Sequence, residues 1–326
     1  MNISCFFCMN KFYLIKYTCI FFGVIITGKI MSKRGIQKSG FDYFLLFLYI
    51  IFFSVIGYAI LSGFSYYMTP LIERPRHPDY WVLKPGAFRS HGFGILGSSM
   101  MILLLIYSIR KRTRFLGQKG SMKHWLNFHI FLGITGPLFI ILHSTLKLNG
   151  LVSVSFWSMI AVALSGILGR YLYLQIPRTI AGNELSLQGV QMLNSQMMDN
   201  IKGKFSLESR EIEQMEMELY PLLNKQAGLL SILIAFAITD ITSYLKTSRI
   251  RKFLEYKFKI PKSQAIELIS LLRHKAKLNR RLQFWNKIHQ MFHYWHVFHK
   301  PFAVIMYIIM FIHIGISVWL GYIWIF

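Results

Sequence analysis

The sequence predicts an all-α fold, a polytopic membrane helical bundle of five transmembrane helices, or six in an alternative interpretation, with a helical cytoplasmic insert. Of the 326 residues, 54% are hydrophobic and 16% are aromatic, and the mean hydropathy is +0.43. Five apolar runs approach or exceed the roughly 20 residues that cross about 30 Å of hydrocarbon as a helix. A long polar segment between the fourth and fifth runs holds most of the acidic residues. Together these features favour a membrane protein over a soluble one.

The five predicted spans cover residues 41–68, 92–107, 125–146, 151–176 and 302–326. We therefore place four helices within residues 41–177 and the last within 296–326. Residues 1–40 form an N-terminal extension with two open interpretations. An apolar run that follows Lys11 and Lys16 is compatible with an extra helix. Alternatively, the basic segment that begins at Met31 is the natural start of the protein.

The charge distribution predicts the orientation of the helices. The loop between the second and third spans holds six lysines and arginines and no acid between Arg110 and Lys123, which is typical of a cytoplasmic loop. The segment 178–295 is then also cytoplasmic, and we expect the inner (cytoplasmic) membrane of a bacterium. The net charge of +24 is compatible with nucleic acid, but in a membrane chain such charge lies beside anionic lipid headgroups. We therefore predict membrane lipid as a partner and no nucleic acid.

The cytoplasmic insert, residues 178–295, is expected to be helical and solvated. Its apolar run 229–237 is too short to span a bilayer, and Asp240 follows closely. A buried helix of a small cytoplasmic bundle, or a helix on the membrane surface, is the preferred interpretation of this run. A further span here is the weaker alternative. After Pro261, apolar residues recur at helical spacing and predict another helix.

Two spans each carry a pair of histidines fourteen positions apart, His129 with His143 and His299 with His313. Fourteen residues of helix separate the two side chains by roughly 21 Å and return them to within roughly 40° of one face. Both spans run outward, so His129 faces His299 near the cytoplasm and His143 faces His313 near the outside. Two imidazoles on facing helices fill both axial positions of a haem iron. The sequence thus predicts two bis-histidine haem b sites.

Small residues near these histidines agree with flat macrocycles, although helix packing also explains them. They are Gly133, Gly136 and Gly315. A second alternative is that the four histidines only form hydrogen bonds within the bundle. Ionisable groups inside a membrane are scarce and usually functional, which favours the haem interpretation.

The motifs around these histidines resemble those of the ferric-reductase-like transmembrane domain family. The third span contains Trp-Leu-Asn-Phe-His-Ile-Phe-Leu-Gly, and the last contains Phe-His-Lys-Pro-Phe-Ala. The resemblance covers residues 41–176 and 292–326 and implies that His129, His143, His299 and His313 are axial haem ligands. Family enzymes continue into flavin and nicotinamide domains, whereas no dinucleotide-binding pattern follows the last span here. Direct oxidation of NADPH is therefore not expected.

Three further residues are weaker candidates for contacts with the cofactors. His91, at the outer end of the second span, could face propionates of the external haem or a quinol, and Arg170 could do so on the inner side. His296 continues the stripe of His299, His293 and His289 on one helix face, where propionates, a quinone pocket or a second metal ion could lie. Headgroup contacts and an interfacial belt are equally compatible with these positions.

The function predicted from these features is transmembrane electron transfer. The chain would be the membrane subunit of a quinol-linked or other respiratory oxidoreductase complex. Redox partners would then include quinol, a cytoplasmic dehydrogenase or an external c-type cytochrome. One alternative is a self-contained haem reductase of metal ions, oxygen or quinone. Another is a cofactor-free transporter or structural membrane subunit.

Overall fold

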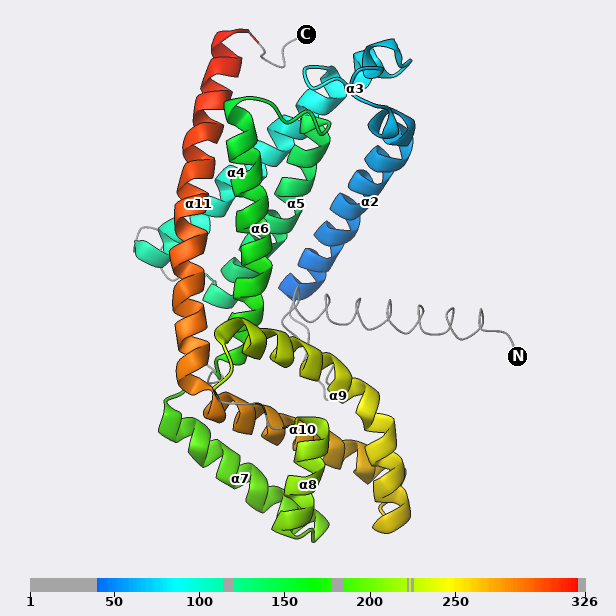
Figure 1. Cartoon of the computed structure of the whole chain (residues 1–326), viewed down its shortest axis with the longest axis vertical. Helices are drawn as coiled ribbons and strands as arrows, with labels where there is room; N and C mark the ends of the chain where they lie inside the picture. Colours follow the sequence, from blue (N-terminus) through cyan, green and yellow to red (C-terminus); the bar gives the residue numbers. More distant parts are fainter. Residues whose placement is uncertain (1–39, 114–119, 178–183, 222, 224–225, 322–326) are drawn as a thin grey trace, which may run out of the picture. The chain divides into compact units, whose positions relative to one another are not determined.

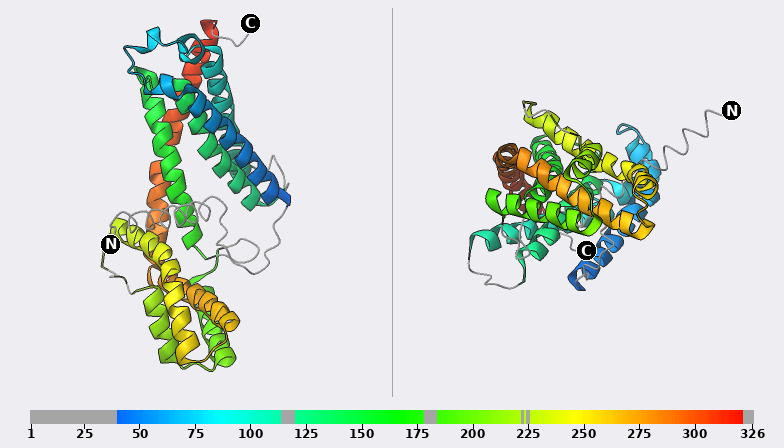
Figure 2. Two further views of the ribbon diagram at one scale, coloured as in Figure 1. Left: turned by 90° about the vertical axis from the view of Figure 1, so that its right-hand side faces the viewer. Right: turned by 90° about the horizontal axis from the view of Figure 1, so that it is seen from below.

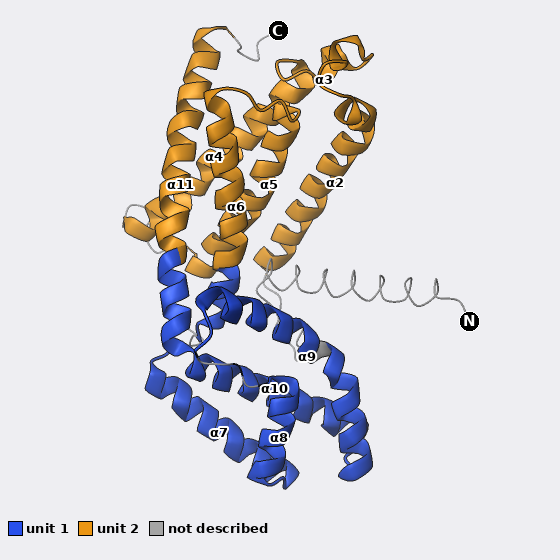
Figure 3. Ribbon diagram, viewed as in Figure 1, with its two compact units in different colours: residues 1–22, 170–294 blue, residues 23–169, 295–326 orange. Residues whose placement is uncertain are grey.

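A computed structural model describes residues 40–113, 120–177, 184–221, 223 and 226–321 (Figure 1). These residues form helices joined by loops, without a β-strand in the described ranges, so the all-α prediction is confirmed. They divide into two compact units (Figure 3). The membrane unit comprises described residues up to Gly169 and from Trp295 onward, and the insert unit comprises Arg170–Tyr294. The extra helix or alternative start predicted in the N-terminal extension lies outside the described residues.

The membrane unit contains the helices that could cross a bilayer. They are α2 (Gly40–Met68), α4 (Phe88–Arg112), α5 (Met122–Ser144), α6 (Leu151–Gln175) and α11 (Trp285–Trp319). The last residues of α6 and the first of α11 belong to the insert unit. Between α2 and α4 lie the short helices η1 (Arg74–Arg76) and α3 (Tyr80–Leu83). Five described helices are long and apolar enough to span a membrane, which confirms the prediction of an integral membrane protein with five spans.

The helix that carries the last span extends further than the predicted segment. The apolar run begins at Phe302 and the last helix was expected within residues 296–326, but α11 is continuous from Trp285 and contains Pro301. The helix α5 likewise contains Pro137. Prolines are tolerated within membrane helices because neighbouring groups satisfy the backbone carbonyl that loses its hydrogen bond. Pro301 is therefore an internal residue of the helix and not its first.

Close packing of α4 on α5 forms the centre of the membrane unit. A Cβ atom added at Gly97 would lie 2.8 Å from the Ile140 side chain and 3.2 Å from the Gly136 carbonyl oxygen. Glycines at both positions let the two backbones approach, as is common in membrane helix pairs. The side chains of Phe131 and Phe139 are fully buried beside this contact. Gly136 therefore contributes to helix packing, which was the alternative to leaving room for a macrocycle.

Hydroxyl groups join α11 to two neighbouring helices near its middle. The Tyr307 hydroxyl donates to the Met101 carbonyl oxygen of α4 at 2.7 Å. The Ser155 hydroxyl of α6 donates to the Met306 carbonyl oxygen at 3.1 Å. Such interhelical hydrogen bonds contribute where apolar contact with lipid offers little driving force. They fix the position of α11 along its axis relative to α4 and α6.

The insert unit is a bundle of α7 (Leu187–Phe205), α8 (Ser209–Leu219), α9 (Leu229–Lys257) and α10 (Lys262–Gln283), seen from two further directions in Figure 2. The central helix is α10, which contacts the other three. Local signals begin two of these helices. The Ser186 side chain accepts from the Gly189 N–H, and Glu208 with Glu211 forms a capping box. Leu254, Leu268 and other apolar side chains form its core.

The apolar run 229–237 is the first part of the longer helix α9. This helix packs against α8 and α10, with Ile232 and Phe236 almost fully buried. The observed packing agrees with the helix of a small bundle that the sequence favoured. A sixth span would require the bent halves of α9 to act as one crossing.

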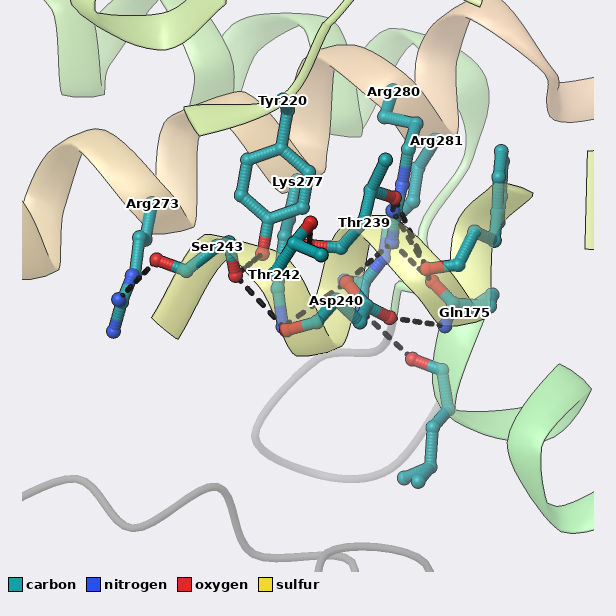
Figure 4. A network of polar contacts seen from close by, with 12 residues as sticks. Gln175, Tyr220, Thr239, Asp240, Thr242, Ser243, Arg273, Lys277, Arg280 and Arg281 are labelled. Atoms are coloured by element: carbon teal, nitrogen blue, oxygen red, sulfur yellow. Dashed lines mark hydrogen bonds and ion pairs between the residues drawn. The ribbon is translucent and has the colours of Figure 1, made fainter. Parts of the chain in front are cut away.

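A buried carboxylate, Asp240 of α9, organises the polar centre of the insert unit (Figure 4). Arg280 donates to one of its oxygens at 2.9 Å, and the ammonium of Lys277 lies 3.6 Å from the same oxygen. Tyr171 and Gln175 donate to the other oxygen at 3.0 and 3.4 Å. Burial opposes ionisation of Asp240, but Arg280 and Lys277 hold its pKa below the ordinary value. The carboxylate therefore stays charged among these cations.

We predict that Asp240→Asn destabilises the insert unit by about 3–5 kcal/mol, because Arg280 and Lys277 would remain buried without a counterion. The surface variant Glu255→Gln is the control, since it removes only an exposed pair with Arg251 and should cost less than about 1 kcal/mol. Thermal unfolding and limited proteolysis of the detergent-solubilised chain provide the measurement.

The pH dependence has a fixed sign. Because the pKa of Asp240 is lowered in the folded state, its stabilising contribution is present at neutral pH and is lost as the pH falls below about 4. Asp240→Asn should lack this loss. Equal stability of Asp240→Asn and the unsubstituted protein at neutral pH would contradict the role assigned to Asp240.

Candidate functional site

The histidine that ends α5, His143, is oriented by α4. Its Nδ1 atom lies 2.9 Å from the Ser90 carbonyl oxygen. A carbonyl only accepts, so Nδ1 carries the proton and donates, and the lone pair of the neutral ring is on Nε2. The Ser90 hydroxyl in turn donates to the Leu83 carbonyl oxygen at 2.7 Å. This arrangement leaves Nε2 as the available metal-ligating atom.

A glycine on α4 provides the space for the His143 ring. A Cβ atom added at Gly94 would lie 2.6 Å from Nδ1 and 2.8 Å from Cε1 of that ring. Any larger residue would therefore displace the imidazole. Gly94 belongs to a stretch of α4 that also contains Gly92 and Gly97.

The structure brings three histidines together at this end of the unit. The His91 ring centroid lies 6.3 Å from that of His143. His313 of α11 is close enough to His143 and to His91 for their rings to interact electrostatically. The sequence-predicted partners His143 and His313 are thus near each other, and His91 lies beside them.

The second predicted pair lies fourteen residues, or about four helical turns, earlier on the same helices, α5 and α11. His129 of α5 and His299 of α11 lie within electrostatic range of each other. The His129 ring centroid lies 4.9 Å from that of Tyr107, with the two rings tilted by 42°, and the imidazole is buried beside the Leu104 carbonyl.

A serine of α6 orients His299. The Ser165 Oγ atom lies 2.8 Å from Nδ1 of His299 and 2.9 Å from the Val162 carbonyl oxygen. A hydroxyl has a single proton, and the carbonyl can only accept it. Ser165 therefore donates to Val162 and accepts from the Nδ1–H of His299. As with His143, the lone pair is left on Nε2.

An indole packs against the same histidine. The Trp295 and His299 ring centroids are 5.1 Å apart, and the indole N–H donates to the Ser165 carbonyl oxygen at 2.7 Å. Gly169 makes room for this indole, since a Cβ there would overlap its ring. Ser90, Ser165 and Gly169 could not be identified from the sequence, because each acts through a tertiary contact and α6 alone holds four serines.

The weaker candidates are placed differently from one another. His296 lies beside Trp295, with ring centroids 4.4 Å apart, and within electrostatic range of His299. Arg170 is buried in the insert unit with its guanidinium over the Tyr173 ring at 5.5 Å. Its predicted contact with a propionate stays a prediction.

A separate metal site built from several side chains has no counterpart in the described residues. No group of three or more His, Cys, Asp or Glu side chains among them could hold a metal ion. His289 instead lies 2.5 Å from a carboxylate oxygen of Glu184. Axial ligation of a haem needs only two imidazoles and is a different arrangement.

The glycines predicted to leave room for a macrocycle also differ. A Cβ at Gly315 would meet no atom within 4 Å, and one at Gly133 would meet only Leu104 at 3.8 Å. Gly133 lies one turn after His129 and adjoins space beside it, whereas Gly315 is exposed and lies about 200° around the helix from His313, so it leaves no room beside that histidine.

Comparison with known proteins gives no family assignment. No family model matches the chain, and neither a curated protein nor a solved structure shows significant similarity to it. The function must therefore be argued from the residues themselves.

We predict that Gly94→Ala lowers the stability of the solubilised chain by about 1–3 kcal/mol, because the new methyl group displaces the His143 ring from its bond with Ser90. Gly57→Ala is the matched control on α2, since its Cβ would meet nothing within 4 Å. The measurement is thermal unfolding in detergent. Identical midpoints for the two variants would show that the ring moves without cost.

Proposed function

We propose that this protein carries electrons across a membrane through two bis-histidine haem b groups. His129 and His299 would hold one haem, and His143 and His313 the other. The observation that carries the proposal is the hydrogen bonding of two imidazole rings. In His143 and His299, the Nδ1–H group donates to a protein oxygen, so the lone pair of the ring is on Nε2. Metal-ligating histidines almost always have their second nitrogen satisfied in this way.

The side chains fit the cofactor chemically. A haem with two imidazole ligands supplies a one-electron redox centre without a vacant position for a substrate. The Ser90 carbonyl and the Ser165 hydroxyl would hold two of the ligand rings in a single orientation. The space at Gly133, one turn after His129, would accommodate the edge of a flat group.

The protein would act in the bacterial inner membrane with its insert in the cytoplasm. The cation-rich connection after α4 supports this orientation by the positive-inside rule. Part of that connection, residues 114–119, lies outside the described residues. In this orientation the pair His129–His299 is cytoplasmic and the pair His143–His313 is external.

Membership of the ferric-reductase-like transmembrane family is part of the proposal and rests on the histidine spacing alone. Quinol, a cytoplasmic dehydrogenase and an external c-type cytochrome are the proposed redox partners. His91 would contact a propionate or a quinol at the external haem, because its ring lies beside that of His143. His296 would do so near His299.

The decisive experiment is a reduced-minus-oxidised spectrum of the purified chain with haem quantification. Two low-spin b-type haems per chain are expected. A colourless protein after purification with added haem would contradict the proposal and favour a cofactor-free transporter or structural subunit. Reduction of metal ions, oxygen or quinone by the isolated chain would favour a self-contained reductase.

His143→Ala should remove the external haem and leave one haem per chain, and His129→Ala should remove the cytoplasmic one. The reason is that each variant deletes one axial ligand of one site. His293→Ala is the control, because this exposed histidine of α11 belongs to neither pair. Haem content and potentiometric titration distinguish the two variants. Loss of both haems in either folded variant would contradict two independent sites.

Ser165→Ala should raise the reduction potential of one haem and leave the other unchanged. The Ser165 oxygen accepts from Nδ1 of His299 and increases the basicity of this ligand, which favours the oxidised iron. Ser165→Thr should restore the original potential, and Ser153→Ala should not alter it, since the Ser153 hydroxyl bonds the Gly150 carbonyl oxygen at the start of α6. An unchanged redox titration of Ser165→Ala would remove this positioning role.

A further inference from the structure

One face of the first part of α9 is apolar and exposed. Its members are Leu230, Ile234, Ile238 and Leu245, which are 69%, 51%, 54% and 49% exposed. Steps of four residues place Leu230, Ile234 and Ile238 along one side of the helix, and Leu245 follows directly after the bend of α9. We call this surface the α9 face. Exposed apolar patches that are continuous in this way usually mark an interaction site.

The opposite side of α9 is already occupied. Ile232, Phe236 and Ser243 are buried within the insert unit. Asp240 on that side is held by Arg280 of α10, and Arg273 of α10 donates to the Ser243 carbonyl oxygen at 2.6 Å. If α9 left α10 to cross the membrane as a separate span, these buried charges would lose their partners. The α9 face must therefore be covered while the helix stays in its bundle.

Cations follow the α9 face along the chain. Residues 246–262 contain seven lysines and arginines and one acid, Glu255. Lys246, Arg249 and Lys252 occur within two turns after Leu245. Phe253 and Tyr256, which are 44% and 90% exposed, are interleaved with them. Basic clusters with interleaved aromatic and apolar residues are typical of helices that bind anionic membrane surfaces.

A bilayer is also within reach of this helix. The insert unit begins on α6 and ends on α11, and both helices continue as membrane spans. Such a tether keeps the unit at a high effective concentration near lipid headgroups. We propose that α9 lies along an anionic membrane surface, with the α9 face in the boundary between headgroups and acyl chains and the exposed Arg249 and Lys252 against lipid phosphates.

Site-specific quenching in nanodiscs tests this surface with the full chain. Cys5, Cys8 and Cys19 are first replaced by serine, and a bimane label is attached at Ile234→Cys. Met192→Cys on α7, 64% exposed, is the matched control. In discs that contain phosphatidylglycerol, a nitroxide-labelled lipid should quench the label at 234 at least twofold more strongly than the label at 192. Aqueous iodide should show the reverse order.

Two results would overturn the proposal. Strong iodide quenching at 234 would leave the α9 face in water. Protection of position 234 from both quenchers would mean that protein, such as a second copy of the chain, covers it.

The cations provide a second arm of the experiment. The double variant Arg249→Gln and Lys252→Gln should weaken lipid quenching at 234, and discs of phosphatidylcholine alone should do the same. The control Lys202→Gln with Arg210→Gln removes the same charge from exposed positions of α7 and α8. Insensitivity to both changes would refute the assigned contact with anionic headgroups. This readout requires no haem, so its outcome is separate from that of the electron-transfer proposal.

Discussion

The arrangement of the membrane unit depends on the hydrogen bonds made by the Nδ1 atoms of two imidazoles, those of His143 and His299. A neutral histidine within a membrane bundle has one donor and one acceptor, and both must be satisfied. The Ser90 carbonyl oxygen of α4 and the Ser165 hydroxyl oxygen of α6 each accept a hydrogen bond from the Nδ1–H group of a histidine on another helix. Helices that provide no proposed ligand therefore determine how the ligands point. This requirement explains why α5 and α11 need α4 and α6 beside them.

In the insert unit, the buried polar groups that need partners are charged side chains and not neutral rings. Here, cations outnumber the carboxylates that face them, and Asp240 is surrounded by Arg280 and Lys277. Burial and the neighbouring Arg280 lower the pKa of Arg281 to about 10, although it still donates to the Leu174 carbonyl oxygen at 2.7 Å. The unit is thus held by a few fully buried polar contacts as well as by its apolar core. Such contacts fix which faces of the helices meet.

The sequence predicted those features that depend on local pattern. Apolar runs of sufficient length identified the five spans, and a spacing of fourteen identified the four histidines. It could not identify Ser165 as the partner of His299, because 134 positions separate them and serine is common in membrane helices. The space at Gly94 depends in the same way on a ring from another helix. The length of α11 before residue 296 was not predicted, because its first turns are polar and lie outside the apolar run that identified the span.

The hydroxyl bonds near the middle of α11 have a consequence for both histidine pairs together. Met306, whose carbonyl accepts from Ser155, is seven residues from His299 and seven from His313. Seven residues are about two helical turns, so all three positions lie near one face. A tilt of α11 about this fixed point would move the two imidazoles in opposite directions. Neither pair can then be adjusted alone, and the separation between the sites is a property of the helix rather than of either pocket.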